Sequence, residues 1–278
     1  MADYNLEITY RGTRLKHVPH PKYLGVTLDK TLTFKTHLTN VASKIDSRIN
    51  IVQKLTGTDW GADSLTLRTS TIALVYFVAE YCFPVWLNST HAKKVDIKLN
   101  QSMCIISGTI KTTPLDWLPD LSSIISPQHR RQTALLKLWS KLNNNTTHPI
   151  HEHSKFCNNL CIRRLKSRKP PWETAIKLNT AKYDAVQCLK DEWEKSELSN
   201  SSLIKNPTNK QPGFNLPRRI WKTLNRLRIG HGRVGHFMHK WGITPNPGCD
   251  CGAPNQNIDH IIRECPKRKF GGKLEDIF

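Results

Sequence analysis

The amino-acid sequence predicts a mainly α-helical protein, with short β-strands near the N-terminus and a small zinc knuckle near the C-terminus. Three observations support this fold class. Apolar residues recur with helical spacing in segments spread over residues 36–228, whereas alternation of apolar and polar residues is confined to residues 6–28. Three cysteines and one histidine gather within residues 249–265.

Residues 6–28 have the period of β-strands. Leu6, Ile8 and Tyr10 alternate with polar residues, Arg11-Gly12 is typical of a turn, and residues 23–29 form a second alternating run. Strands this short do not make a stable domain by themselves. We therefore expect residues 1–35 to be the end of a larger sheet.

Residues 36–110 are predicted to form three helices in a compact up-down unit. The first has Thr36 as its N-cap and ends near Gly57, with Lys44 and Arg48 facing away from its apolar side. The second, residues 64–83, is apolar nearly all round and should lie at the centre of a bundle. The third, residues 91–107, has Val95, Leu99, Met103 and Ile106 on its inner face.

Residues 111–145 extend this unit. A Pro-Leu-Asp-Trp-Leu-Pro stretch at 114–119 interrupts the helical pattern, and a fourth helix follows over residues 127–142 with Arg130 and Arg131 near its start. We expect a boundary near residue 145. The next region, 146–215, has a basic run at 163–169, an acidic helix in which Trp193 packs inward, and a Ser/Asn/Pro-rich connector at 199–213.

Residues 146–215 also contain a second group of metal-ligand types, namely His148, His151, His153, Cys157 and Cys161. Their spacing matches no pattern with a clear mechanism. Cys157 and Cys161 are equally typical of the apolar face of a short helix, and we favour that interpretation over a second metal site.

The last region, 216–278, begins with a basic helix that starts at Pro217 and ends at Gly230. Ile220, Leu224 and Leu227 are predicted to form one face of this helix, with the arginines around the rest. The glycine-rich residues 230–236 are expected to be a turn between helices, because the lysine of a nucleotide-binding loop is missing. We expect Trp221 and Trp241 to be core residues, with base stacking as the alternative.

The spacing C-x-C-x8-H-x4-C near the C-terminus predicts one structural zinc ion held by Cys249, Cys251, His260 and Cys265. Gly252 allows a tight turn after the first pair, and a short helix introduced by Asn257 and Asp259 should carry the other two ligands. Four unrelated residues in a polar tail are the alternative. A tail this short has little apolar material on which to fold without a metal.

The charge distribution indicates a polyanionic partner. The formal net charge is +20 and the sequence pI is about 9.8. Residues 205–278 hold 14 Lys and Arg against 5 Asp and Glu, whereas residues 171–204 hold 4 against 6. The residues predicted to contact phosphates are Lys44, Arg48, Arg130, Arg131, Arg218, Arg219, Lys222, Arg226, Arg228, Lys267, Arg268 and Lys269.

The sequence favours a reducing compartment and no membrane span. Eight cysteines occur without a signal peptide at the N-terminus, so we expect thiols and metal ligands in place of disulfides. The longest apolar run, residues 71–87, carries Glu80 and Pro84 and is therefore expected to be a buried helix.

Five stretches in order resemble the polyproteins of LINE-type (non-LTR) retrotransposons, most closely the jockey-like group of arthropods. The stretches are residues 23–37, 79–86, 114–119, 224–232 and 249–265. In that family an endonuclease is followed by a reverse transcriptase. The resemblance implies that residues 1–35 are the last palm strands, 36–110 the helical thumb, 111–145 a thumb extension, and 216–278 the Cys-His region.

The resemblance also implies that catalytic carboxylates are missing from this chain. The family's polymerase holds Mg²⁺ with palm carboxylates, one pair of them in an aromatic-x-Asp-Asp turn, and no such pair occurs here. We therefore expect no catalytic residues, and binding of RNA and DNA template and primer without polymerisation by this chain alone. The missing endonuclease and polymerase parts are expected partners, and the nucleus or a cytoplasmic ribonucleoprotein the expected location.

Two other functions fit the sequence less well. One is a free-standing zinc-dependent RNA- or DNA-binding protein, which a defined sequence preference of the chain alone would favour. The other is a metal-dependent nuclease that uses His148, His151 and His153, although no carboxylates are grouped near them.

Overall fold

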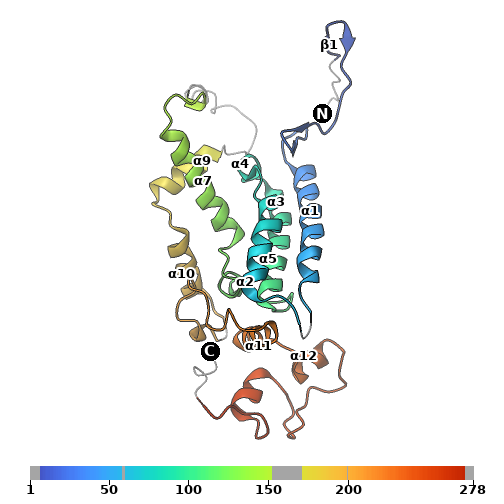
Figure 1. The fold of residues 1–278 in the computed structure, drawn as a ribbon, viewed down its shortest axis with the longest axis vertical. Helices are drawn as coiled ribbons and strands as arrows, with labels where there is room; N and C mark the ends of the chain where they lie inside the picture. The colour runs from blue at the N-terminus through green and yellow to red at the C-terminus, as the bar shows by residue number, and fades with distance from the viewer. Residues whose placement is uncertain (1–6, 58–59, 152–170, 199, 273–278) are drawn as a thin grey trace.

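The computed structural model describes residues 7–57, 60–151, 171–198 and 200–272. Figure 1 shows a long helical bundle, with the N-terminal strands extending from one end and the C-terminal helices lying at the other. The prediction of a mainly helical protein with a few short strands is confirmed for the described residues.

The strands form two small antiparallel hairpins. Strand β1 (Thr9–Tyr10) pairs with β2 (Thr13–Arg14), and β3 (Lys22–Tyr23) pairs with β4 (Val26–Thr27). Both turns have positive φ at their two central residues, 49° and 76° at Arg11-Gly12 and 45° and 83° at Leu24-Gly25, as a type I′ turn requires. The prediction of one continuous strand over residues 23–29 is therefore wrong, because Leu24-Gly25 reverses the chain.

Three helical segments form the centre of the bundle. They are α1 (Lys35–Lys54), α2 (Ser64–Thr71) with its continuation through a π-helical turn (Ile72–Tyr76) into α3 (Phe77–Ala79), and α5 (Lys93–Ser107). Their shared core includes Leu38, Ile45, Leu67, Val75 and Met103, all fully buried. The inner face predicted for α5 is confirmed, since its residues Val95, Leu99, Met103 and Ile106 are buried.

Two predicted details of this centre are wrong. Helix α1 follows Phe34, which has a φ of 58°, and Thr36 lies within the helix instead of capping it. The second helix is not buried all round, because Phe77 is 75% exposed and Tyr81 is 50% exposed. Helical structure there is interrupted at Cys82, which has a φ of 49°, before the short helix α4 (Phe83–Trp86).

Helix α6 (Trp117–Ser122) and helix α7 (Pro127–Asn143) pack on this centre. The guanidinium groups of Arg130 and Arg131 donate to the carboxylates of Glu80 and Asp96, respectively. These ion pairs join the start of α7 to the central helices.

The described part of residues 146–215 adds a further layer, made of α9 (Pro171–Thr180) and α10 (Ala185–Lys195). Trp193 is buried, as predicted, with its ring edge-on to Trp117 at a centroid distance of 5.0 Å. His129 of α7 contacts Tyr183 Oη at 2.6 Å and Glu192 Oε2 at 2.9 Å. Farther along, Ile204 and Gln211 are buried, so part of the predicted connector packs into the fold.

Helix α11 (Arg218–Arg228) crosses the C-terminal end of α5 with a polar face. Its buried side chains are Arg218, Trp221, Asn225 and Arg228, whereas Ile220 is 46% exposed. The apolar face predicted for this helix is therefore not its most buried one, since Leu224 and Leu227 are half-buried and Ile220 is exposed. The reason is that the last carbonyl groups of a helix have no partner within the helix, and donors on α11 reach those of α5.

Four side chains of α11 make this contact. Arg218 donates to the Ile105 and Ile106 carbonyls, and Trp221 Nε1 also donates to Ile106 O. Asn225 Nδ2 donates to Ser107 O at 2.8 Å, and Arg226 Nε to Gly108 O at 3.2 Å. Cationic groups at this position also complement the negative end of the α5 dipole.

The second group of potential ligands falls largely outside the described residues. His153, Cys157 and Cys161 lie there, while His151 Nε2 is 3.0 Å from both Leu142 O and Asn145 O. In the part of the chain that the structure describes, no helix combines the length and apolar character needed to cross a membrane.

Candidate metal centre

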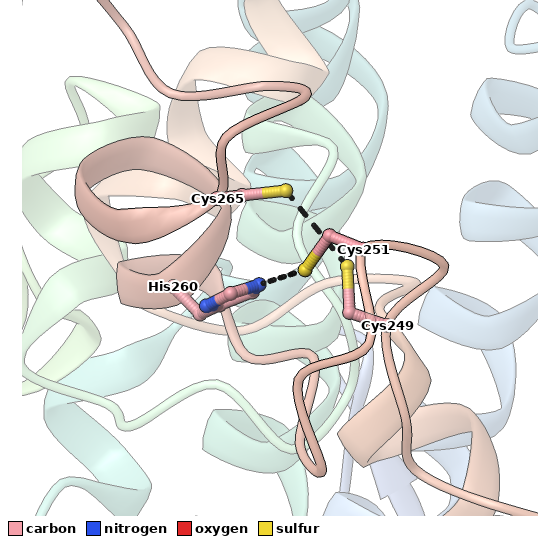
Figure 2. A group of neighbouring side chains, drawn as sticks. All are labelled: Cys249, Cys251, His260 and Cys265. Atoms are coloured by element: carbon pink, nitrogen blue, oxygen red, sulfur yellow. Dashed lines mark hydrogen bonds between the residues drawn. The ribbon is translucent and has the colours of Figure 1, made fainter.

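The first two potential ligands lie on a tight turn. The Cys249 N–H donates to Ala253 O at 2.9 Å, and the Gly252 N–H donates to Cys249 O at 3.0 Å. Gly252 has a φ of 97°, a conformation that suits glycine and that the sequence predicted at this turn. Figure 2 shows the Cys249 and Cys251 thiols pointing to the same side of the turn.

The other two potential ligands are brought together by a π-helical turn, His260–Glu264. Asn257 Oδ1 accepts from the His260 N–H at 2.6 Å, and the Cys265 N–H donates back to His260 O at 2.7 Å. In an α-helix, residues five apart point roughly 140° away from each other. The wider turn of a π-helix reduces this divergence. Cys265 is the residue directly after the helix, whereas the sequence predicted it to lie within the helix.

The four side chains converge on one point (Figure 2). Their ligand atoms all lie within 4.8 Å of one another, with Cys249 Sγ 3.9 Å from Cys265 Sγ and Cys251 Sγ 3.3 Å from His260 Nε2. Thiolates about 2.3 Å from a tetrahedral zinc ion stand ~3.8 Å apart. The Cys249–Cys265 distance fits that geometry and is far longer than a disulfide bond of about 2.05 Å.

The surrounding groups suit a metal site as well. His260 turns Nδ1 toward Glu264 Oε2 at 3.4 Å while Nε2 faces the thiols, the arrangement by which carboxylates orient metal-bound histidines. Gln256 Nε2 and Arg268 Nη1 lie 3.5 Å and 3.6 Å from Cys249 Sγ. A hydrogen bond from the Cys251 backbone N–H lowers the pKa of the Cys249 thiol to about 6, which favours the thiolate that binds metal.

Gln256 is a residue of this candidate site that the sequence analysis missed. Its side-chain oxygen accepts from the Gly235 N–H at 2.8 Å, and its backbone oxygen accepts from the His236 N–H at 3.0 Å. The same side chain therefore contacts a potential ligand, Cys249, and the first turn of α12 (Gly235–Lys240). Nothing in the cysteine and histidine spacing identifies it.

A small apolar cluster completes the C-terminal part. Val234, Ile258 and Ile262 are buried together, with Leu227, Phe237 and Ile261 packed against them. This cluster contains residues from α11, α12 and the π-helical turn, so the potential metal site is joined to both preceding helices.

The residues predicted to bind phosphate fall into two groups in this structure. Seven donate hydrogen bonds within the protein: Arg130, Arg131, Arg218, Arg226, Arg228, Lys267 and Arg268. Arg268 pairs with Asp250 and lowers the pKa of that carboxyl to about 2. Of the other five, Lys44, Arg48, Arg219 and Lys269 are exposed, while Lys222 is half-buried. Phosphate binding by all twelve stays a prediction.

The two tryptophans of this region differ in exposure. Trp221 is fully buried, as predicted, whereas Trp241 is 40% exposed and is not the core residue that was expected.

Three curated proteins are similar to nearly the whole chain. The Pol polyprotein of the type-1 retrotransposable element R1 of Bradysia coprophila is 22% identical over 93% of this chain and 25% of its own length. The putative 115 kDa protein of the element R1DM of Drosophila melanogaster gives the same identity and coverage. A Pol polyprotein of the element R1 2 of Nasonia vitripennis is 20% identical over 95% of this chain and 62% of its own length.

These similarities confirm the resemblance to retrotransposon polyproteins. The chain spans about a quarter of the length of two of these relatives and less than two thirds of the third. No protein-family model matches the sequence, and no solved structure matches it.

Proposed function

We propose that this chain, a homologue of R1 retrotransposon polyproteins, is the part of a retrotransposon RNA-directed DNA polymerase that holds template and primer. In this proposal residues 36–110 are the thumb, and residues 216–278 are a zinc-stabilised nucleic-acid-binding module. The observation that carries the proposal is the similarity to such polyproteins over 93–95% of the chain.

The structure supports the binding half of the proposal through charge and geometry. The potential ligands Cys249, Cys251, His260 and Cys265 have the distances of a closed tetrahedral site, which in proteins is typically a structural zinc. This site belongs to a region with a large excess of Lys and Arg. Bound zinc would hold together a segment with few apolar contacts of its own.

In this proposal the residues of this chain do not catalyse polymerisation. A polymerase activates the primer hydroxyl with Mg²⁺ held by grouped carboxylates. In the proposal those carboxylates belong to the palm, outside this sequence, and this chain binds the duplex without catalysing the reaction.

The test is binding of the full chain to an RNA-template, DNA-primer duplex at several salt concentrations, with and without a zinc chelator. Phosphate contacts predict that the logarithm of affinity falls by roughly 0.7–0.9 per contact for each unit of log salt. We expect a steep salt dependence and weaker binding after chelation, restored by added zinc. Absence of binding, or a flat salt response, would overturn the proposal.

A further inference from the structure

Three aromatic rings at α12 are stacked in a row, which we call the aromatic ladder: His231, Phe237 and Trp241. The His231 and Phe237 centroids are 4.2 Å apart with planes 33° from parallel, and those of Phe237 and Trp241 are 5.9 Å apart at 31°. Phe237 and Trp241 are four residues apart, which places them on the same side of a helical turn. The row therefore has Phe237 in the middle and Trp241 at one end.

The ladder is anchored at its middle and accessible at one end. Phe237 packs against the buried cluster of Val234, Ile258 and Ile262. Trp241 at the end of the row is 40% exposed, although tryptophan is the largest apolar side chain and the other tryptophan of this region, Trp221, is fully buried. An exposed aromatic ring at the end of an existing stack is a surface on which one more flat ring can stack.

The charge of the surrounding sequence indicates which kind of aromatic ligand would stack on Trp241. Between Glu197 and Asp250 the chain has no acidic residue, whereas it has nine lysines and arginines. Two of them, Arg233 and Lys240, are exposed and lie within two residues of His231 and Trp241 in the sequence. A flat aromatic ligand attached to a polyanion matches this combination, and that is a nucleobase in a nucleic-acid strand.

The ligand must have unpaired bases. Inside a duplex, away from its two ends, each base is covered on both faces by its neighbours and offers no face to Trp241. A single strand exposes these faces, and protein aromatic side chains bind them with little dependence on sequence.

We propose that the aromatic ladder is a stacking site for an unpaired base of single-stranded RNA or DNA, with Trp241 as the contacting ring and Arg233 and Lys240 as phosphate contacts. This inference rests on the proposed function and adds to it a defined site and a class of ligand. In the proposed function the duplex is held through its phosphates, whereas this site binds the face of a base.

The ladder is joined to the potential metal centre through Gln256. Its side chain accepts from the Gly235 N–H at the start of α12 and lies 3.5 Å from Cys249 Sγ. His236 Nδ1 also lies 3.1 Å from Asn255 Oδ1. The turn that holds Cys249 therefore also fixes the helix that carries Phe237, so the site depends on the fold of the knuckle.

The experiment compares the full chain with Trp241→Ala and Trp241→Phe for binding to a 15-nucleotide oligothymidylate and to a 15-base-pair DNA duplex. Loss of one stacked base corresponds to a fold-change of about 5 to 150. We expect Trp241→Ala to lose that factor for the single strand, to leave duplex binding within about twofold, and to keep the slope of log affinity against log salt. Trp241→Phe should recover much of the loss.

The matched control is Tyr10→Ala, which removes another highly exposed aromatic ring on β1, outside both proposed binding regions and at the end of the molecule opposite α12 (Figure 1). It should leave both affinities unchanged. Circular dichroism and thermal unfolding establish that each variant is folded, and Trp241→Phe serves as the test if Trp241→Ala is not.

The outcomes separate the inference from the proposed function. If the unchanged chain binds neither oligonucleotide, the proposed function fails. If it binds both, yet Trp241→Ala has no effect or weakens both equally, the stacking site is wrong and the proposed function stands.

Discussion

At the scale of single residues, Cys265 is the most buried of the four potential metal ligands, with no exposed surface. Cys265→Ser replaces a thiolate by a hydroxyl, which stays protonated at neutral pH and is a poor ligand for zinc. We expect the zinc content of the purified chain to fall from about one per chain to a small fraction of that, as measured by elemental analysis.

Cys188→Ser is the control for this prediction. Cys188 is a half-buried thiol on α10, outside the four-residue group, and its replacement should leave the zinc content unchanged. Retention of zinc by Cys265→Ser, with loss in Cys188→Ser, would show that the ligands were assigned wrongly.

Asp120 is a second residue for which we make a prediction, here about the dependence of stability on pH. It is 1% exposed, and both of its carboxylate oxygens lack a hydrogen-bond partner. Burial, with a smaller contribution from nearby Asp116, raises the pKa of Asp120 to about 8. The folded chain therefore keeps this proton at pH values where the unfolded chain has lost it.

The pH dependence of stability follows from this difference in pKa. The free energy of unfolding should fall as pH rises from about 4 to about 8, because the folded state binds the extra proton over that range. At pH 7 the cost is at most ~4 kcal/mol. We expect Asp120→Asn to raise the urea midpoint at pH 7 and to flatten its decline with pH.

Asp116→Asn provides the comparison for this measurement. Asp116 is exposed and its replacement leaves Asp120 to titrate, so the decline between pH 4 and pH 8 should persist. If the urea midpoint of Asp120→Asn fell with pH as steeply as that of the unchanged chain, Asp120 would not be the group that causes the decline.

At the scale of helices, the contact between α11 and the end of α5 holds the C-terminal part on the bundle. Asn225 is fully buried and donates to Ser107 O. Asn225→Leu keeps a similar size but leaves that carbonyl without its donor, which costs roughly 1–3 kcal/mol of unfolding free energy. Chemical denaturation should show a lower midpoint.

Thr223→Ala, on the exposed side of the same helix, is the control for Asn225→Leu. Its hydroxyl donates to Arg219 O within α11 at 3.0 Å, and we expect a change within about 0.5 kcal/mol. Equal effects of the two substitutions would mean that the loss reflects helix propensity and not the contact with α5.

Helix positions could be predicted well from the sequence, whereas their buried faces and ends were predicted less well. The apolar spacing of α5 gave its inner face directly, because that face packs against other apolar side chains. The same reasoning failed for α11, because Arg218 and Asn225 are buried to satisfy carbonyl groups of a helix more than a hundred residues earlier. Local periodicity carries no information about such distant acceptors.

The candidate metal site could be predicted from the sequence because its ligand types and spacing are local. The π-helical turn that brings His260 and Cys265 together could not, since its backbone geometry depends on packing of Ile258 and Ile262 with α12. The contact of Gln256 with Cys249 and Gly235 could not be predicted either, because it depends on the same packing. Its contacts join the turn to Gly235, which lies 21 residues earlier.

At the scale of the whole molecule, the bundle lies between two hairpins at one end and the C-terminal helices at the other (Figure 1). Helix α1 runs from the hairpins toward the end where α11 and α12 lie. Its exposed residues Lys44 and Arg48 are four apart and therefore share one side of the helix. In the proposed function this side of the thumb faces the duplex.

The last prediction tests that orientation with two double variants of equal charge. Lys44→Ala with Arg48→Ala removes two cations from α1, and Lys137→Ala with Lys141→Ala removes two exposed cations from α7, on the opposite side of the view in Figure 1. If α1 contacts two phosphates, the slope of log affinity for the primer-template duplex against log salt should fall in magnitude by about 1.4–1.8 in the first variant only. Because both variants lower the net charge equally, a general loss of attraction would weaken binding in both alike. Equal changes in slope would therefore place the duplex elsewhere on the molecule.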